Sequence, residues 1–206
     1  MSKKKGQLII ALDVDTANEA KALVDQLGND VDIFKVGSQL FTACGPDIVR
    51  YLIKAGKKVF LDLKFHDIPN TVAHAVSAAV GLTEGGKSIF MCTLHVSGGE
   101  EMLRQAVVAA TKTAQNIGVM LPLLVGITVL TSELKMDNIL QLVLEKAQLA
   151  KESGLDGVVA SCQEAAEIRD KFGDDFVIVT PGIRPEGSQA EDQKRTATPS
   201  EAIASG

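Results

Sequence analysis

Aromatic side chains are scarce in this sequence: among 206 residues there is no tryptophan, one tyrosine and seven phenylalanines. Proteins that bind single-stranded nucleic acid stack bases on aromatic rings, so this scarcity argues against that class. Positive charge is also in deficit, because 21 lysines and arginines face 26 aspartates and glutamates. The formal net charge of −5 argues against a general binder of nucleic acid or of an anionic membrane surface.

Cysteine is equally sparse, and the three cysteines are Cys44, Cys92 and Cys162. Their odd number and wide spacing match no zinc site and suggest a reducing compartment. No apolar run reaches the length of a membrane span, about 20 residues. The basic start at 1–6 is followed by an apolar run of one strand's length, which is too short for a signal peptide. We therefore expect a soluble, cytoplasmic protein with no membrane partner.

Several motifs that carry chemistry are missing. No G-x-G-x-x-G follows the first apolar run, which argues against a dinucleotide-binding fold. No G-x-S-x-G occurs, which argues against a hydrolase with a catalytic triad. The histidines, cysteines and carboxylates show no metal-ligand spacing, so no metal site is predicted.

Apolar runs alternate with helix-like segments along the whole chain. The runs expected to be strands are 7–14, 31–37, 57–65, 88–96, 121–130, 157–161 and 176–182. The expected helices are 16–28, 46–56, 71–81, 100–116, 137–153, 161–172 and a last short one from 198. Near-continuous hydrophobicity is typical of strands in a buried parallel sheet. Because no linker interrupts the alternation, we expect a single α/β domain over residues 1–206.

Local signals mark where some of these helices begin. Thr16 with Glu19 and Ser161 with Glu164 have the spacing of capping boxes. Pro46 is expected at the first position of its helix, where its missing N–H costs nothing.

Polar residues decide between the two architectures that fit this alternation, a doubly wound sheet and a (β/α)8 barrel. At or just past the C-terminal ends of different expected strands lie Asp13, Lys35, Asp62, Lys64, His95, Thr128 and Arg184. Barrel active sites are assembled at that face. The chain ends after the seventh expected strand, so the prediction is a (β/α)8 TIM barrel whose eighth strand is missing from a chain truncated at its C-terminal end.

The most informative segment is Asp-Leu-Lys-Phe-His-Asp-Ile-Pro-Asn-Thr at 62–71. Side chains on a strand alternate between its faces, so Asp62 and Lys64 are expected to point the same way, with Asp67 in the loop that follows. Two carboxylates and an ammonium in a partly desolvated place are costly, and such clusters occur where chemistry takes place. A structural ion pair at a strand end is the alternative interpretation.

Lys35 and Asp13 are candidates for the same cluster. A lysine inside an apolar strand either extends outward to water or belongs to a site. Beside an acidic strand end, Lys35 would continue a series of alternating charge with the charged groups of 62–67. Asp13 could accept hydrogen bonds from ligand hydroxyls, or it could cap the following helix.

Arg184 and the polar loop at 186–195 suggest a phosphate site with a lid. An arginine after a strand end can pair with a phosphate, and long polar loops at this face often close over ligands. A plain surface loop is the alternative. His95 is interpreted as a structural histidine at a strand end.

These segments resemble the bacterial orotidine 5′-phosphate decarboxylases, the enzymes of the last step of de novo UMP synthesis. The resemblance covers essentially the whole chain and follows the family's order: Ala-Leu-Asp at 11–13, Phe-Lys-Val-Gly at 34–37, the string at 62–71, Thr-Val-Leu-Thr-Ser at 128–132 and Pro-Gly-Ile-Arg-Pro at 181–185. The string at 62–71 is highly specific. Its Asp-x-Lys-x-x-Asp core is shared with related sugar-phosphate decarboxylases and synthases.

The resemblance implies decarboxylation of orotidine 5′-phosphate to UMP without a cofactor. It implies that Lys64 donates the proton to the pyrimidine carbon that loses carbon dioxide, that Asp62 lies beside the substrate carboxylate, and that Lys35 completes the array and contacts ribose. It also implies a homodimer with shared sites, in which the residues that reach into the partner's site are Asp67, Ile68 and Thr71.

The other contacts implied by the resemblance are Asp13 with ribose, Thr131 with the pyrimidine, and Arg184 and Gln193 with the phosphate and base on the lid side. The family's phosphate-binding Gly-Arg pair follows the eighth strand, beyond the end of this chain.

The residues themselves are also compatible with three other functions. A sister enzyme acting on a ketose phosphate through a magnesium-stabilised enediolate would use the same Asp62, Lys64 and Asp67 differently. A Schiff-base aldolase through Lys64 is disfavoured, because the adjacent carboxylate favours the charged amine. A non-catalytic binder of phosphate ligands is the third.

Overall fold

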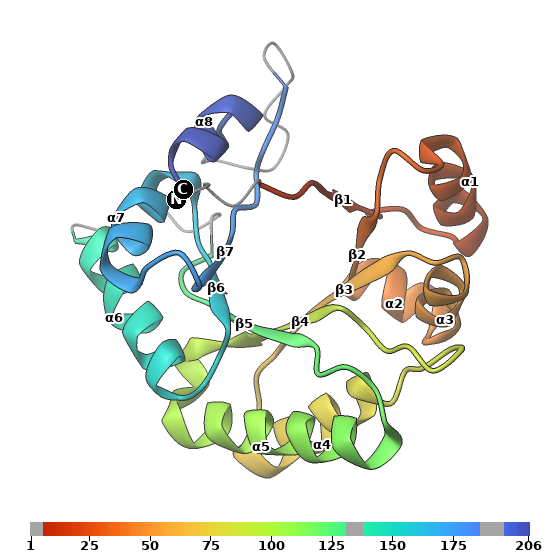
Figure 1. Ribbon diagram of the computed structural model, residues 1–206, viewed down its shortest axis with the longest axis horizontal. Coiled ribbons are helices and arrows are strands. Elements are labelled where there is room, and N and C mark those ends of the chain that lie inside the picture. Colours follow the sequence, from red (N-terminus) through yellow and green to blue (C-terminus); the bar gives the residue numbers. More distant parts are fainter. Residues whose placement is uncertain (1–5, 131–137, 186–195) are drawn as a thin grey trace.

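The strands form one curled parallel sheet (Figure 1). The computed structural model describes residues 6–130, 138–185 and 196–206. In chain order the strands are β1 (Ile9–Ala11), β2 (Ile33–Gly37), β3 (Lys58–Phe65), β4 (Met91–His95), β5 (Leu123–Ile127), β6 (Gly157–Val159) and β7 (Val177–Val179). Each strand pairs in parallel with the next, as the apolar runs predict. The arc is that of a (β/α)8-type barrel, and β1 and β7 form the edges of the described sheet.

Helices lie on the outer side of the sheet (Figure 1). They are α1 (Ala17–Leu27), α2 (Ser38–Cys44), α3 (Asp47–Lys54), α4 (Pro69–Val80), α5 (Gly99–Ile117), α6 (Ile139–Glu152), α7 (Cys162–Phe172) and α8 (Pro199–Ala204), with a short 3-10 helix, η1 (Val96–Gly98), before α5. Every strand is therefore followed by helix before the next strand begins, which places all the C-terminal strand ends at one face of the barrel.

Capping residues set several of the helix starts. Thr16 and Glu19 form the expected capping box at α1, and Thr198 with Glu201 forms a second one at α8. Ser161 caps α7 differently from the prediction. Its hydroxyl accepts from the N–H of Gln163, while the N–H of Glu164 donates to the Ser161 carbonyl, so the tightened first turn replaces the expected box.

The segment between β2 and β3 also differs from the prediction, because it holds two helices instead of one. The unpredicted helix α2 has Leu40 as its only buried residue, so its sequence carries almost no helical periodicity. Pro46 precedes the second helix as its N-cap, one position earlier than expected. Such one-residue differences at helix ends are common.

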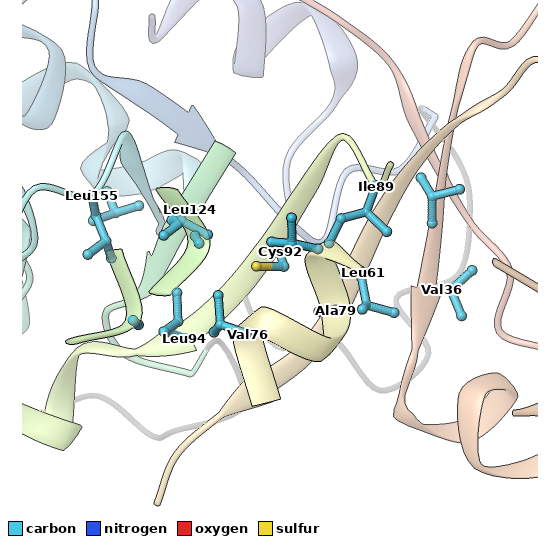
Figure 2. Close-up of a cluster of buried hydrophobic side chains, with 14 of the residues drawn as sticks. Val36, Leu61, Val76, Ala79, Ile89, Cys92, Leu94, Leu124 and Leu155 are labelled. Atoms are coloured by element: carbon cyan, nitrogen blue, oxygen red, sulfur yellow. The ribbon is translucent and has the colours of Figure 1, made fainter. Parts of the chain in front are cut away.

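Alternating strand side chains divide the core into two parts. The outward-facing ones pack against helices, and Figure 2 shows Leu61, Cys92 and Leu94 beside Val76 and Ala79 of α4. The inward-facing ones form a smaller cluster inside the curled sheet, made of Ile33, Phe60, Met91 and Val125. This inner cluster corresponds to one of the side-chain layers that fill such barrels.

The inward face changes from apolar to polar toward the C-terminal strand ends. Two residues beyond the inner apolar layer, the same faces of β2, β3 and β4 carry Lys35, Asp62 and Thr93. The polar layer therefore rests on a packed apolar floor. That floor fixes the strands on which the polar side chains are mounted.

Candidate active site

Strand β3 departs from regular geometry within the charged segment. Leu61 is paired with Cys92 of β4, but the next pairing is Phe65 with Leu94, so residues 62–64 lie opposite Thr93 alone. Lys64 has a φ of +51°, in the left-handed region that is costly for residues with a Cβ. Backbone outliers of this kind are concentrated at functional sites.

Charges of alternating sign meet at this irregularity. The Lys64 Nζ lies 2.7 Å from the Asp62 Oδ2, and the Asp62 residue is only 7% exposed. The Lys35 Nζ lies 3.9 Å from the same Asp62 oxygen and 3.0 Å from the Asp13 Oδ1. The structure thus brings Asp13, Lys35, Asp62 and Lys64 together as one charge array. Opposite neighbours offset the cost of desolvating each charge.

Thr93, on β4, forms hydrogen bonds with two residues of the array. It is fully buried, and its Oγ1 accepts a hydrogen bond from the Lys64 N–H at 2.8 Å and donates one to the Asp62 Oδ1 at 3.0 Å. The two oxygens of the Asp62 carboxylate therefore have different partners. Oδ1 is held by a neutral hydroxyl, and Oδ2 faces the two ammonium groups.

The Lys35–Asp13 ion pair lies near the C-terminal ends of β1 and β2. Thr16 caps α1, so the helix start does not need Asp13 as its cap. Gly37 follows Lys35 on the same face, and a Cβ at Gly37 would lie 3.2 Å from the Lys35 Nζ and 3.7 Å from the Asp13 Oδ1. The absence of a side chain at Gly37 leaves the space beside this ion pair open.

His95 ends β4 on the side of the array, and its ring centroid lies 5.3 Å from that of His66. Burial lowers the pKa of His95, and His66, Lys64 and Lys146 lower it further, whereas Asp62 acts in the opposite direction. Lys146 of α6 reaches this end of the barrel, where its Nζ donates to the Thr128 carbonyl at 2.8 Å. The surroundings therefore favour a neutral His95 imidazole.

Three predicted site residues of the 62–71 segment lie at the surface. Asp67, Ile68 and Thr71 are all exposed, and 65% of Ile68 is accessible. The Asp67 Oδ1 accepts from the N–H of Ile68 at 2.6 Å, inside its own loop. Of the four predicted catalytic residues, the described chain thus assembles Lys35, Asp62 and Lys64, and it leaves Asp67 at the surface.

Arg184 lies just beyond β7, half-buried, and its guanidinium donates to the Ile183 carbonyl at 3.0 Å. A backbone bridge joins Ile183 to Ala197, so the described residues on either side of 186–195 lie next to each other. The segment itself lies outside the described residues, and so do the two predicted ligand contacts Thr131 and Gln193.

Metal-ligand clusters and membrane-spanning helices are both absent from residues 6–130, 138–185 and 196–206. These residues contain no group of three or more His, Cys, Asp or Glu side chains that could hold a metal ion. No helix in the same ranges is long and apolar enough to cross a membrane.

Comparison with protein families adds an independent observation. The sequence model described as "Orotidine 5′-phosphate decarboxylase / HUMPS family" matches residues 6–206, nearly the whole chain. The chain belongs to this family.

Relatives in the orotidine 5′-phosphate decarboxylase family are similar over most of their length. The chain is 47% identical to orotidine 5′-phosphate decarboxylase of Vibrio cholerae serotype O1, over 97% of this chain and 86% of that protein. It is 45% identical to that of Syntrophomonas wolfei, with the same two shares covered. The crystal structure of orotidine 5′-phosphate decarboxylase from Lactobacillus acidophilus superposes with a TM-score of 0.79 at 35% identity, covering 97% of this chain and 86% of that one. The family therefore fits both sequence and fold.

Sequence reasoning missed two residues that shape the array in this family member, Thr93 and Gly37. Thr93 is a polar residue in the apolar strand Met-Cys-Thr-Leu-His, two positions before His95 and on the same face. That placement was a usable signal, because a buried threonine needs a partner for its hydroxyl. Gly37 gave no comparable signal, since its importance depends on where the Lys35 ammonium lies in space.

Proposed function

We propose that this chain decarboxylates orotidine 5′-phosphate to UMP in de novo pyrimidine biosynthesis. The observation that carries the proposal is the contact between the Lys64 ammonium and the Asp62 carboxylate at the C-terminal mouth of the barrel. Membership of the family and the names of relatives at 45–47% identity support the choice of substrate.

Lys64 has the properties that the reaction demands. When the bond between the pyrimidine ring and the carboxylate breaks, carbon dioxide leaves and the electron pair stays on a ring carbon, with no carbonyl placed to absorb it. An ammonium fixed beside that carbon stabilises the developing charge and then supplies its proton. The chemistry proposed for Lys64 therefore needs no cofactor.

Asp62 serves two purposes in this proposal. Its Oδ2 holds the Lys64 ammonium at 2.7 Å, which orients the proton donor. Placed beside the substrate carboxylate, Asp62 would also repel it, and the departure of carbon dioxide relieves that repulsion. Lys35, at 3.9 Å from Asp62 and 3.0 Å from Asp13, limits the net negative charge of the site.

The rest of the substrate is assigned to the residues around the array. Asp13 and Lys35, whose side chains are accessible at the mouth of the barrel, would bind the ribose hydroxyls. Arg184 would bind the phosphate with Gln193, and Thr131 would contact the pyrimidine. Binding of the phosphate, remote from the reacting carbon, would then help to hold the ring against Lys64.

A homodimer with shared sites forms the last part of the proposal. Asp67, Ile68 and Thr71 are exposed directly after the strand that carries Lys64 and Asp62, and Ile68 is a large apolar residue with 65% of its surface accessible. An exposed isoleucine beside two polar side chains suits a contact with a second subunit. In that arrangement Asp67 would complete the array of the partner's site.

The purified chain, incubated with orotidine 5′-phosphate and followed by ultraviolet absorbance, tests the proposal directly. We expect turnover to UMP that is the same with and without EDTA. Turnover of a ketose phosphate that EDTA abolishes and magnesium restores, with no turnover of orotidine 5′-phosphate, would support the enediolate chemistry of a sister enzyme. UMP binding without any turnover would indicate a non-catalytic binder, and either outcome would contradict the proposal.

A further inference from the structure

Thr93 occupies a position that an apolar residue would be expected to fill. It lies in the middle of β4, has no exposed surface, and sits directly above the inner apolar layer that contains Met91. A buried hydroxyl must find hydrogen-bond partners to offset its desolvation, and here both partners belong to the charged segment of β3.

The direction of both hydrogen bonds follows from the chemistry of the partners. The Lys64 backbone N–H can only donate, so it uses a lone pair of the Thr93 Oγ1. The single hydroxyl proton is then available for the Asp62 Oδ1, which as part of a carboxylate can only accept. One hydroxyl thereby connects the backbone of the proposed proton donor with the carboxylate that holds its ammonium.

The backbone of Lys64 needs such a partner. Its positive φ and the shift of register between Leu61 and Phe65 interrupt the β3–β4 ladder at this point. Opposite the interruption stands Thr93, whose side chain bonds to the Lys64 N–H in the gap between the two regular pairings. A strained conformation persists only where its surroundings hold it, and the Thr93 hydroxyl supplies that hold.

The same hydroxyl determines how the Asp62 carboxylate is turned. With Oδ1 bound to Thr93 at 3.0 Å, Oδ2 is directed toward the Lys64 and Lys35 ammonium groups at 2.7 and 3.9 Å. Without the hydroxyl, the carboxylate could rotate and one ammonium would lose its partner. β-branched threonine is suited to this task, because its χ1 angle is restricted.

We propose that Thr93 is a positioning residue for decarboxylation, holding the Lys64 backbone and the Asp62 carboxylate in their reactive arrangement through one hydroxyl group. The inference rests on the proposed function and assigns Thr93 no contact with the substrate. It separates Thr93 from an ordinary core threonine, which would affect folding but not the rate of the chemical step.

Thr93→Val provides the main test, because valine has nearly the same shape and lacks the hydroxyl. We expect kcat for orotidine 5′-phosphate to fall by roughly 10- to 100-fold, as for the loss of a hydrogen bond to a charged group. KM and the affinity for UMP should change by no more than about threefold, because the residues assigned to ribose and phosphate are untouched. Thr93→Ser keeps the hydroxyl and should retain kcat within about threefold of wild type.

Thr111→Val is the matched control. It removes a threonine hydroxyl that bonds to the Val107 carbonyl within α5, away from the array, and it should leave kcat unchanged. If Thr93→Val fails to fold, Thr93→Ser and Thr93→Ala carry the test, because they differ only in the hydroxyl. The serine variant should then have the far higher kcat.

The outcomes separate the inference from the function on which it rests. A wild-type protein without turnover would overturn the proposed function and the role of Thr93 with it. An active wild type, with Thr93→Val or Thr93→Ala as fast as the hydroxyl-bearing variants, would overturn the inference alone. A rate loss shared equally by Thr93→Ser and Thr93→Val would also overturn it, because the hydroxyl would then be irrelevant.

Discussion

The Lys64 Nζ and the Asp62 Oδ2 are 2.7 Å apart, although the backbone of Lys64 leaves the regular β conformation. The ion pair is therefore built with the help of a local distortion and is not the product of strand alternation alone. The distortion lies at the C-terminal mouth of the barrel, above a packed apolar layer. A rigid floor below a strained and charged segment is the arrangement expected of a preorganised site.

The first prediction is that a side chain at position 37 disturbs the neighbouring Lys35 ammonium. The backbone of Gly37, with φ −91° and ψ −179°, accepts alanine without strain, so Gly37→Ala should fold normally. The new Cβ would lie 3.2 Å from the Lys35 Nζ and would push this ammonium a few tenths of an ångström from its present position beside Asp13 and Asp62. We expect turnover to fall by roughly tenfold, as for small misplacements of reacting groups.

Gly45→Ala is the control for this substitution. Gly45 has a φ of +64° with nothing near its missing Cβ, so alanine there strains the backbone without touching the array. It should lower the free energy of unfolding by about 1–2 kcal/mol and leave turnover of the folded enzyme unchanged. If Gly37→Ala loses stability instead of activity, its role is structural.

Arg184→Ala tests the assignment of the phosphate. A charged hydrogen bond to phosphate is worth roughly 1.5–3 kcal/mol, so UMP should bind somewhat over tenfold more weakly. Uridine has no phosphate, and its affinity should be nearly unchanged. Calorimetric titration of both ligands against wild type and variant decides the matter. Equal losses for UMP and uridine would mean that Arg184 does not bind the phosphate.

His95 predicts a component of stability that depends on pH. Its pKa in the folded protein is lowered below the ordinary 6.5, so between these two values the unfolded chain binds more protons than the folded one. Stability should therefore rise with pH through this window, be fully present above about 6.5, and decline as the pH falls. The groups facing the imidazole are His66, Lys64, Lys146 and Asp62.

Chemical unfolding of wild type and His95→Gln over this pH range measures the effect. The difference in unfolding free energy between the two proteins should vary below about pH 6.5 and stay constant above it. Curves that remain parallel throughout would show that His95 does not titrate differently on folding.

Mixed dimers test whether subunits share their sites. Lys64→Ala and Asp67→Ala should each be inactive alone. In a mixed dimer, one site combines the intact Lys64 of one subunit with the intact Asp67 of the other, so part of the activity should return.

Subunit exchange must be demonstrated independently, for instance with two affinity tags on the two variants. Exchange without any recovery of turnover would count against Asp67 reaching the partner's site. Each variant mixed with itself provides the baseline.

Much of the fold could be predicted from the sequence, because buried parallel strands and amphipathic helices leave strong periodic patterns. The capping box of Thr16 and Glu19 and the strand ends at Gly37 and Phe65 illustrate this. Helix α2 could not be found in this way, since its seven residues bury only Leu40. Short elements held by their neighbours carry little information of their own.

The site was predictable where it depends on charge and was hidden where it depends on contacts between strands. Asp62, Lys64 and Lys35 are conspicuous as charges inside apolar runs. The left-handed φ of Lys64 arises from the mismatch of β3 with β4, which no local sequence pattern describes. The same mismatch places Thr93 opposite residues 62–64, where its hydroxyl bonds to Lys64 and Asp62.

Turnover of Lys64→Ala, measured together with its thermal unfolding, is the most direct test of the charge array. The Lys64 side chain is 37% exposed, so its removal should leave the fold intact. We predict that kcat falls by at least roughly 10²-fold, the contribution of a positioned general acid alone, while the melting temperature stays close to that of wild type. Lys58→Ala, at the opposite end of the same strand, should have wild-type turnover. A Lys64→Ala enzyme that decarboxylates orotidine 5′-phosphate at a rate near wild type would contradict the account.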